Sequence, residues 1–460
     1  MRSGCRRRAA GSTSVPEAAV GWRAAATIYL RPRLLLVFFL GVLSGLPLAL
    51  TGATLTIWLA EAGVSKATIG AFSLVGIAYT FKFAWSPLLD RLPLPGLTAR
   101  LGRRRGWLLA TQALLVVAML GLGVGDPHAN AAGIALWAVL LAFASASQDI
   151  VIDAYRVELL EEAEYGAGAS MVVFGYRVGM LLSGAGALLL AQHAGWFAAY
   201  AVMAAVIVAG MLLVLAAPEP AVPAEAAEAV PGRPDGVGAW LERAVWSPLA
   251  EFASRPGWWL VLLFVLLYKL GDALAGVMTS PLYVELGFTK DEIAAVVKLY
   301  GFWATLLGAF LGGIGVARWG ITPSLFAFGA LQLLSNLMFA ALARSGHDLW
   351  MLAATIGLEN LTGAMGTTAF VAYLSRLTNV AFTATQYALL SSLTAVGRTM
   401  AAAPGGLLAE RLDWVGYFGF TAAAALPGLL LLVLLVRRYP AGGSLRKVGP
   451  GSREPIEEAP

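Results

Sequence analysis

Long runs of apolar residues recur along almost the whole chain, and they constrain the fold more than any other feature. Twelve runs can be distinguished, and polar segments separate them. They cover residues 34–59, 69–89, 107–124, 132–156, 168–191, 197–217, 258–281, 291–315, 323–343, 349–374, 382–408 and 414–436. A helix of about 20 apolar residues crosses the hydrocarbon core of a bilayer and satisfies its own backbone hydrogen bonds there. The sequence therefore predicts an all-α membrane protein with twelve transmembrane helices.

The composition and the charge distribution agree with this prediction. Of the 460 residues, 59% are hydrophobic and 13% are charged, whereas soluble domains carry about 25% charged residues. With the N-terminus placed in the cytoplasm, the cytoplasmic segments hold 23 Lys and Arg residues and the outer loops hold 4. Because Lys and Arg gather on the cytoplasmic side of membrane proteins, both termini are expected there. The net charge of +5 then reflects topology, and no nucleic-acid partner is expected.

The apolar runs form two groups of six, and the longest interior polar segment, 218–257, lies between them. It begins rich in Pro, Ala and Glu, which is typical of a linker. The expected domains are a cytoplasmic N-terminus (1–33), a six-helix bundle (34–217), a cytoplasmic linker (218–257), a second six-helix bundle (258–436) and a cytoplasmic tail (437–460). Within the linker, apolar residues recur at helical spacing over 238–253, which favours an amphipathic helix on the membrane interface. A plain linker is the alternative.

Nine ionisable residues lie well inside the apolar runs, where each charge costs about 2.5–3.5 kcal/mol on insertion scales. They are Lys82, Asp149, Asp153, Arg177, Lys269, Asp272, Lys298, Glu359 and Arg398. The third, sixth, ninth and twelfth runs contain none of them. Because such groups need partners or a wet cavity, we expect the charged helices to line a central cavity and the other four to lie at the periphery. This pattern favours a transport role. The alternative is that the charges form buried ion pairs that only hold helices together.

Depth along the helices suggests which charges meet in the first half. Lys82, Asp149 and Arg177 each lie about two turns from the cytoplasmic end of their runs, which corresponds to roughly 12 Å at 1.5 Å per residue. Asp153 lies one turn below Asp149 and three residues before Arg156. We therefore expect Asp149 in the cavity and Asp153 as a structural partner at the cytoplasmic mouth.

In the second half, the same argument places charges closer to the outer ends. Asp272 and Lys298 match in depth, and so do Glu359 and Arg398. These two pairs are the expected contacts there.

Several classes of function lack support in the sequence. There is no phosphate-binding GxxxxGK[ST] pattern, so ATP is not the expected energy source. His128, His193 and His347 are too scattered to form a metal site, and no nucleophile–base constellation is visible. Cys5 is the single cysteine, which excludes an internal disulfide. We therefore expect no enzymatic activity, cofactor or metal. A receptor would need a sizeable soluble output domain, and no such segment is present.

The loop after the second run resembles the loop signature of the major facilitator superfamily. It reads SPLLDR at 86–91 and LGRRRGW at 101–107. It departs from the usual pattern, because ten residues separate Arg91 from Gly102 and the leading Gly is absent. In the second half, Ala317 stands where Asp is usual. The resemblance implies two six-helix bundles and a cytoplasmic gate, for which we expect Asp90, Arg91, Arg103, Arg104, Asp153 and Arg156.

A narrower resemblance is to the muropeptide permease family AmpG, and it runs in order from about residue 30 to 436. The matching blocks are FKFAWSPLLDR (81–91), SASQDIVIDA (145–154), GYRVGM (175–180), LYKLGDA (267–273), ENL (359–361) and ATQYALLS (384–391). The resemblance implies import of N-acetylglucosamine–anhydro-N-acetylmuramyl peptides from periplasm to cytoplasm by proton symport. It also implies a multi-pass protein of the bacterial inner membrane, which we expect to be a monomer. A transporter of another anionic solute, such as an acetyl-CoA-like compound or a sugar conjugate, and an exporter remain alternatives.

These expectations assign roles to individual residues. Because Lys and Arg receive carboxylates, the expected substrate-binding residues are Lys82, Arg177, Lys269, Lys298, Arg398, Gln148, Tyr176, Tyr268 and Gln386. Because a carboxylate beside an apolar wall can titrate, we expect Asp149 to carry the symported proton, with Glu359 and Asp272 as the next candidates.

Overall fold

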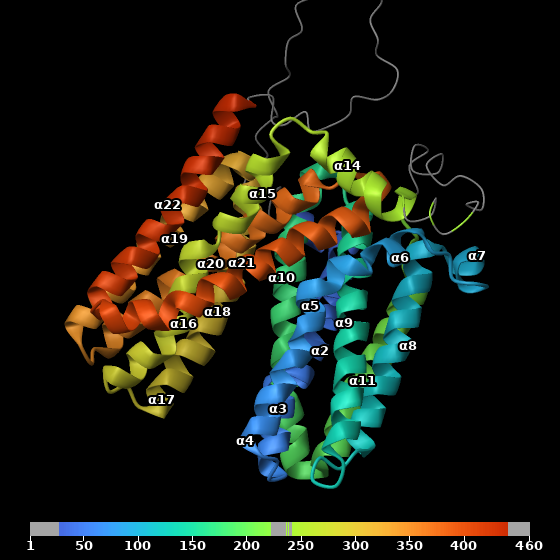
Figure 1. The fold of residues 1–460 in the computed structure, drawn as a ribbon, viewed down its shortest axis with the longest axis horizontal. Helices are drawn as coiled ribbons and strands as arrows, with labels where there is room; N and C mark the ends of the chain where they lie inside the picture. The colour runs from blue at the N-terminus through green and yellow to red at the C-terminus, as the bar shows by residue number, and fades with distance from the viewer. Residues whose placement is uncertain (1–26, 222–235, 237, 239–241, 440–460) are drawn as a thin grey trace, which may run out of the picture.

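The computed structural model describes residues 27–221, 236, 238 and 242–439, and within these residues it contains helices and no strands. The helices form two halves that meet at one end and separate at the other (Figure 1). This arrangement confirms the all-α fold class.

The N-terminal half holds fifteen helical segments, in which η marks 3-10 or π geometry. They are η1 (Ile28–Leu30), α2 (Pro32–Thr51), α3 (Ala53–Glu61), α4 (Lys66–Phe72), η2 (Ser73–Gly76), α5 (Ile77–Phe81), η3 (Lys82–Ala84), α6 (Ser86–Arg91), α7 (Leu97–Leu101), α8 (Arg103–Val124), α9 (Ala131–Leu159), η4 (Glu162–Glu164), α10 (Tyr165–Leu181), η5 (Leu182–Gly186) and α11 (Ala187–Ala216). The first apolar run is broken at Gly52, whose backbone (φ −110°, ψ −111°) is not helical.

The C-terminal half begins after the linker. Its segments are η6 (Glu242–Trp246), α14 (Ser247–Ala253), α15 (Trp258–Leu267), α16 (Leu270–Glu285), α17 (Lys290–Glu292), η7 (Ile293–Tyr300), α18 (Gly301–Trp319), α19 (Ile321–Ser345), α20 (Leu349–Leu377), η8 (Val380–Phe382), α21 (Thr383–Arg411) and α22 (Trp414–Arg438). The seventh run is interrupted at Tyr268 and Lys269, between α15 and α16.

All twelve expected runs lie on these helical segments. Within the described residues, eight helices are long and apolar enough to cross a membrane, judged by length and composition. One of them, Glu162–Ala216, joins the fifth and sixth runs, although Gly195 between them has a positive φ of 84°. The count of twelve spans therefore stays a prediction.

Part of the helix expected over 238–253 forms, and its place at the membrane interface stays a prediction. The structure forms η6 and α14, and it buries Pro248 and Phe252 of α14. Residues 239–241 of the expected helix lie outside the described residues, as do 1–26 and 440–460 of the expected cytoplasmic ends.

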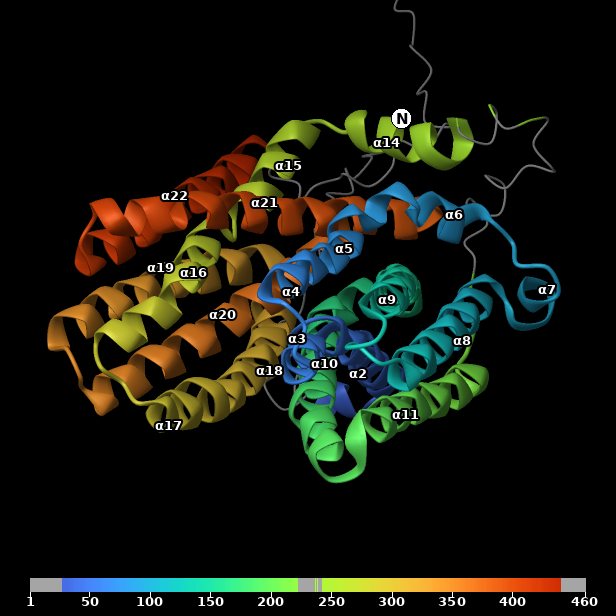
Figure 2. The same cartoon turned by 60° about the horizontal axis from the view of Figure 1, so that its bottom comes forward.

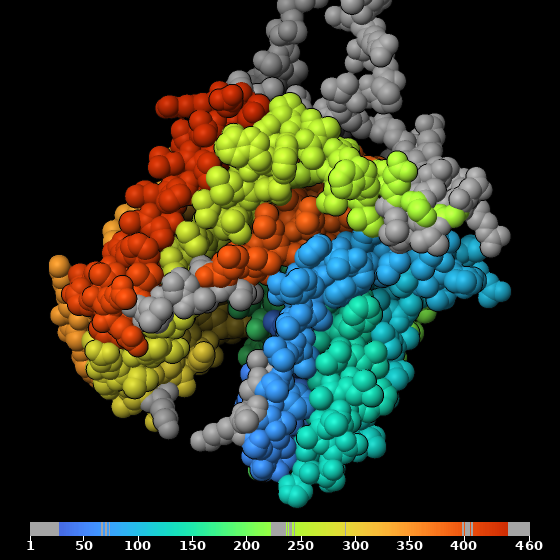
Figure 3. Space-filling model, in the orientation of Figure 1, coloured from blue at the N-terminus to red at the C-terminus, as the bar shows by residue number. Residues whose placement is uncertain are grey.

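The two halves contact each other mainly at the end where α6 and α14 lie (Figure 1). There α21 packs on α6 and α9, while α10 packs on α18 and α20. Figure 2 shows α10 beside α18 in a second view. At the opposite end, the space-filling view shows a wide hollow between the blue–green half and the yellow–red half (Figure 3).

Glycines allow α2 and α10 to pack closely. A Cβ atom added to Gly175 would lie 2.1 Å from the Phe38 carbonyl oxygen, and one added to Gly45 would lie 2.1 Å from the Tyr176 carbonyl oxygen. No side chain fits at these distances, so the two backbones touch directly. Small residues are the usual means of close helix contact in membranes, where no hydrophobic force drives helices together.

This contact predicts a difference between two glycines of one helical stretch. We expect Gly175→Ala to lower the free energy of unfolding by about 1–3 kcal/mol, because the added methyl group overpacks the α2–α10 contact. Gly184→Ala is the matched control, since nothing lies within 4 Å of its added Cβ. Melting temperatures in detergent measure both changes. Equal melting temperatures for the two variants would contradict the role of the contact.

Candidate functional site

The first polar cluster is formed by α2, η3 and α9. The Ser44 hydroxyl donates a hydrogen bond of 2.6 Å to Asp149 Oδ1. One turn along α9, Asp153 lies 3.9 Å from Lys82 Nζ and 3.5 Å from Arg156 Nη2. Lys82 is within electrostatic reach of Asp149, but its ion pair is with Asp153.

The second polar cluster surrounds Lys269, at the break between α15 and α16. Its ammonium group donates to Asp272 Oδ2 at 2.9 Å, to Gln332 Oε1 at 2.9 Å and to the Gly363 carbonyl at 3.3 Å. The depth argument placed Lys298 beside Asp272, whereas the structure pairs Asp272 with Lys269. The reason is local, because residues three apart lie on one helical face.

Glu359 on α20 connects this cluster to the other half. Asp272, Lys269 and Arg177 all act on it electrostatically, and Arg177 belongs to α10 in the N-terminal half. Arg177, which was expected at the level of Lys82 and Asp149, is therefore an electrostatic neighbour of the second cluster. The side chain of Arg398, the expected partner of Glu359, lies outside the described residues.

Arg177 acts electrostatically on Glu359 of the other half, and Lys298 lies on η7, which packs on α20. In the closed part of the interface, the Ser170 hydroxyl of α10 donates to the Ala309 carbonyl of α18 at 2.7 Å. Arg177 lies seven residues beyond Ser170, and Lys298 lies eleven residues before Ala309. The offset of seven residues returns to the same face of α10 toward the open end. Lys298 lies on the π-helical segment η7, where this periodicity does not apply.

These two cations differ from Lys82 and Lys269 in their surroundings. Both are exposed, whereas Lys82 is 9% exposed. Lys82 and Lys269 each pair with an aspartate. Among the described residues, no salt bridge within 4.0 Å involves Arg177 or Lys298.

A buried ionic contact closes the end of the molecule where α6 and α14 lie. Arg104, which is 1% exposed, binds Asp90 Oδ1 at 2.7 Å and Glu158 Oε1 at 2.5 Å. Arg103 donates to the Asp90 carbonyl at 2.6 Å. The other oxygen of Asp90 accepts from the backbone N–H and the hydroxyl of Thr385, at 3.2 and 3.1 Å. Since Thr385 is in α21, Asp90 joins the two halves.

The remaining expected gate residues also cross this interface. Arg156, which is fully buried, donates to Ser375 Oγ at 2.9 Å and to Tyr387 OH at 3.0 Å. The guanidinium of Arg91 lies 4.9 Å from the centre of the Phe382 ring. All six expected gate residues thus lie at one closed end.

The Asp90 carboxylate lies just beyond the apolar run that ends at residue 89. Burial alone would raise its pKa, but Arg104 and Arg103, with hydrogen bonds from Arg104 and Thr385, hold the pKa below its ordinary value. This contact therefore stays charged at neutral pH.

Three residues expected to bind substrate are instead held inside the protein. Gln148 is fully buried and donates to the Leu43 carbonyl at 2.9 Å. Tyr268 is 7% exposed and donates to the Leu325 carbonyl at 2.9 Å. Gln386 is 1% exposed and bonds to the linker helix α14. In this conformation none of the three amide or hydroxyl groups faces the hollow.

The expected residue Tyr176 is half-buried on α10. Sequence reasoning did not single out four residues that complete these clusters, namely Ser44, Glu158, Gln332 and Thr385. Glu158 had a signal, since it is an acidic residue at the same membrane end as a run of three arginines. The other three are uncharged polar residues inside or beside apolar runs, and nothing in the sequence distinguishes them from packing residues.

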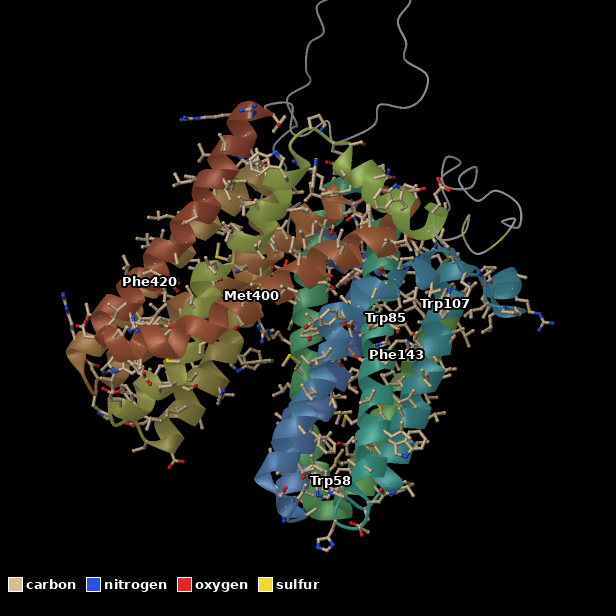
Figure 4. The ribbon with its side chains drawn as sticks, in the orientation of Figure 1. Trp58, Trp85, Trp107, Phe143, Met400 and Phe420 are labelled. Atoms are coloured by element: carbon tan, nitrogen blue, oxygen red, sulfur yellow. The ribbon has the colours of Figure 1, made fainter. Side chains whose placement is uncertain are left out.

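An apolar cavity lies outside the hollow, on the flank of the N-terminal half. Trp85, Trp107 and Phe143 line it and lie close together in Figure 4. The Trp85 indole donates to Ser147 Oγ at 3.0 Å. The residues that line this cavity, all in the described part of the chain, include no ionisable side chain, so it offers nothing to a charged solute.

Sequence comparison places the chain in a family. The model of the Major Facilitator Superfamily matches residues 37–285 and 266–458. The anhydromuropeptide permease of Escherichia coli (strain K12) is 45% identical over 409 residues, which cover 88% of this chain and 80% of that protein. A putative transporter AmpG 4 of Rickettsia conorii is 36% identical, and the match covers 88% of this chain and 96% of the relative.

Solved structures agree on the fold. The proton:xylose symporter XylE matches with a TM-score of 0.65 and 14% identity, over 90% of this chain and 96% of that chain. The human organic anion transporter MFSD10 matches with a TM-score of 0.62 and 17% identity, over 87% of this chain and all of that chain. The chain therefore belongs to the AmpG-type muropeptide permeases of the major facilitator superfamily, a family of membrane transporters.

Proposed function

We propose that this protein imports anhydro-muropeptides, N-acetylglucosamine–anhydro-N-acetylmuramyl peptides, across the bacterial inner membrane by proton symport. The observation that carries the proposal is the 45% identity to an anhydromuropeptide permease along most of both chains. The charged groups beside the hollow fit such a substrate, because its peptide part carries carboxylates that Lys and Arg bind well.

The hollow faces the periplasm in this proposal. It lies at the end opposite α6, α7 and α14, and the excess of Lys and Arg in the loops of that end favours the cytoplasmic side for them. The conformation is then open to the outside and closed by the Asp90 contact inside. Transport proceeds when the two halves rock about the central site and expose it to the cytoplasm.

Arg177 and Lys298 are the first groups that meet the substrate carboxylates. Lys82 and Lys269 pair with aspartates in this conformation, and Lys269 has three acceptors. The two exposed cations lie on opposite halves, so an anion between them neutralises charges that would otherwise repel as the halves close. Lys82, Lys269 and Arg398 are proposed to join later in the cycle.

Asp149 is the proposed proton site, with Glu359 and Asp272 as the next candidates. Asp149 shares its surroundings with Lys82 and Asp153. Protonation of Asp149 removes one of the two negative charges that act on Lys82. That cation is then free for a substrate carboxylate. Proton and substrate then favour the same closing step, which is the requirement for symport.

Glu359 has a related role in the empty carrier. Glu359 is the acidic group that acts electrostatically on Arg177 of the other half. Its neighbours on its own side are Lys269, Asp272 and Tyr283. When no substrate is bound, ionised Glu359 supplies the negative charge that Arg177 needs for closure. The empty carrier can thus return without substrate.

Uptake of labelled anhydro-muropeptide in a permease-deficient strain tests the function itself. Cells that express this chain are expected to accumulate label above the medium concentration, and a protonophore is expected to abolish the accumulation. Efflux of preloaded label without uptake would instead identify an exporter. Uptake of another anionic sugar conjugate, with none of the muropeptide, would assign a different substrate.

Neutralising the exposed cations should weaken substrate binding. We expect Arg177→Gln and Lys298→Gln each to raise KM about tenfold, because a hydrogen bond to a charged group contributes roughly 1.5–3 kcal/mol. Arg344→Gln, at an exposed arginine on α19, is the matched control and should leave KM unchanged. Amidating the substrate carboxylates should raise KM for the parent protein. The same amidation should raise KM much less for the two variants, because the cation that binds a carboxylate is already missing there. Unchanged KM values in both variants would exclude this assignment.

Removing the titratable group of Asp149 should separate proton coupling from binding. In vesicles that contain the Asp149→Asn variant, we expect the substrate accumulation driven by an inward proton gradient to fall about tenfold or more. Exchange of internal for external substrate should continue. Glu162→Gln, an exposed acidic residue, should keep both activities. Gradient-driven accumulation at the parent level in Asp149→Asn would move the proton site to Glu359 or Asp272.

A further inference from the structure

The segment that joins the two halves begins with residues docked on the gate. The Tyr155 hydroxyl of α9 donates to the Pro218 carbonyl at 2.5 Å. The next residue, Glu219, accepts from the backbone N–H groups of Arg104 and Arg105, at 2.8 and 3.0 Å. This carboxylate therefore caps the first turn of α8, where unpaired N–H groups and the helix dipole favour a negative charge.

The capped turn carries the arginine that holds Asp90. Arg104 donates its backbone N–H to Glu219 and its guanidinium to Asp90 and Glu158. Gly102 leaves room for this arrangement, since an added Cβ would lie 2.3 Å from the Glu219 side chain, and its φ of +90° suits glycine. Glu219 thus fixes the backbone from which Arg104 reaches the gate.

The other end of the segment docks on the opposite side of the gate. The Gln386 amide donates to Glu251 Oε2 at 2.6 Å and to the Pro248 carbonyl at 3.1 Å. Arg255 pairs with Glu251 at 2.7 Å, donates to Gln386 Oε1 at 3.2 Å, and donates to the Leu377 carbonyl at 2.5 Å. The helix α14 is therefore tied to the end of α20 and the start of α21.

Gln386 directly follows Thr385, the residue that binds Asp90. Its amide oxygen also accepts from the Asn379 N–H at 2.8 Å. Together these hydrogen bonds restrain the first turn of α21. Gln386 is buried, while its partner Glu251 on α14 is 30% exposed. The turn of α21 that presents Thr385 is therefore held by a helix that lies outside the bundle.

We propose that the inter-bundle segment is a two-ended clasp of the gate, in which Glu219 positions Arg104 and the Glu251–Gln386 contact positions Thr385. This inference rests on the alternating-access transport proposed above, although it does not depend on the substrate. Each end moves with a different half, because Glu219 is attached to α8 and Glu251 is attached to α21. Glu219, Glu251 and Gln386 are positioning residues that act through the Asp90 contact.

The clasp shifts the balance between the two open states. Opening to the cytoplasm separates Asp90 from Thr385. A loosened first turn of α8 or α21 makes this contact weaker, while the hollow on the other side is unaffected. Loss of either end should therefore increase the fraction of molecules open to the cytoplasm.

A single reporter cysteine measures this fraction. Cys5 is the only cysteine, so Cys5→Ser gives a cysteine-free background. Ala388→Cys is the reporter, because Ala388 on α21 is 1% exposed and packs among buried residues of the N-terminal half. N-ethylmaleimide reaches this position only when the halves part at the cytoplasmic end. The full-length protein in lipid vesicles is used, and no substrate is needed.

We expect Gln386→Leu to raise the alkylation rate about tenfold and Glu219→Ala to raise it about fivefold. Glu292→Gln is the control, because it removes a carboxylate that bonds to Thr289 and His347 at the other end of the molecule. It should leave the rate unchanged. Melting temperatures, measured in parallel, show whether each variant is folded.

The outcomes separate the possibilities. Rates within twofold of the parent in both folded variants would overturn the proposal, and a rise at one end alone would overturn its two-ended form. If Gln386→Leu does not fold, Glu251→Gln carries the same test, since it removes the charge that Arg255 and Gln386 share. Because the readout needs no muropeptide, failure of the transport assay would leave this result standing.

Discussion

Charge inside an apolar bundle is the constraint on which this structure depends. An ionised side chain in hydrocarbon is expensive unless it meets a partner or water. The described residues show both solutions. Lys82, Lys269 and Arg104 are paired with carboxylates, while Arg177 and Lys298 are exposed. The paired charges hold helices together at set positions, and the exposed charges are those available to a solute.

Periodicity and charge were enough to predict much of the architecture. The apolar runs predicted helices, and the resemblance predicted two halves and the family. The spacing of three residues placed Asp153 beside Arg156, and the structure pairs them. The depth argument did not predict Lys82 on Asp153, because the second run contains two 3-10 segments that change the direction of its side chains. It did not predict Lys269 on Asp272 either, because it compared depths on different helices, whereas this pair is three residues apart in the chain.

A matching sequence block identifies a family but not the direction of each side chain. Gln148, Tyr268 and Gln386 all lie in matching blocks, and all three are turned into the protein, where they bond to backbone carbonyls or to α14. Thr385, the neighbour of Gln386, binds Asp90 from the opposite half. One residue of difference along a helix is a rotation of 100°, which separates a gate contact from an anchor. Sequence alone cannot resolve that rotation.

The burial of one gate arginine has a consequence for the solvent. Arg156 is 0% exposed in this conformation and donates to Ser375 and Tyr387 of the other half, so parting the halves at that end brings its guanidinium group into water. The state open at this end is therefore the more hydrated one there. Solutes that are excluded from protein surfaces favour the less hydrated state. In the proposed orientation, cytoplasmic osmolarity thus becomes a thermodynamic variable of the transport cycle, and an increase in it favours the conformation described here without altering any single contact.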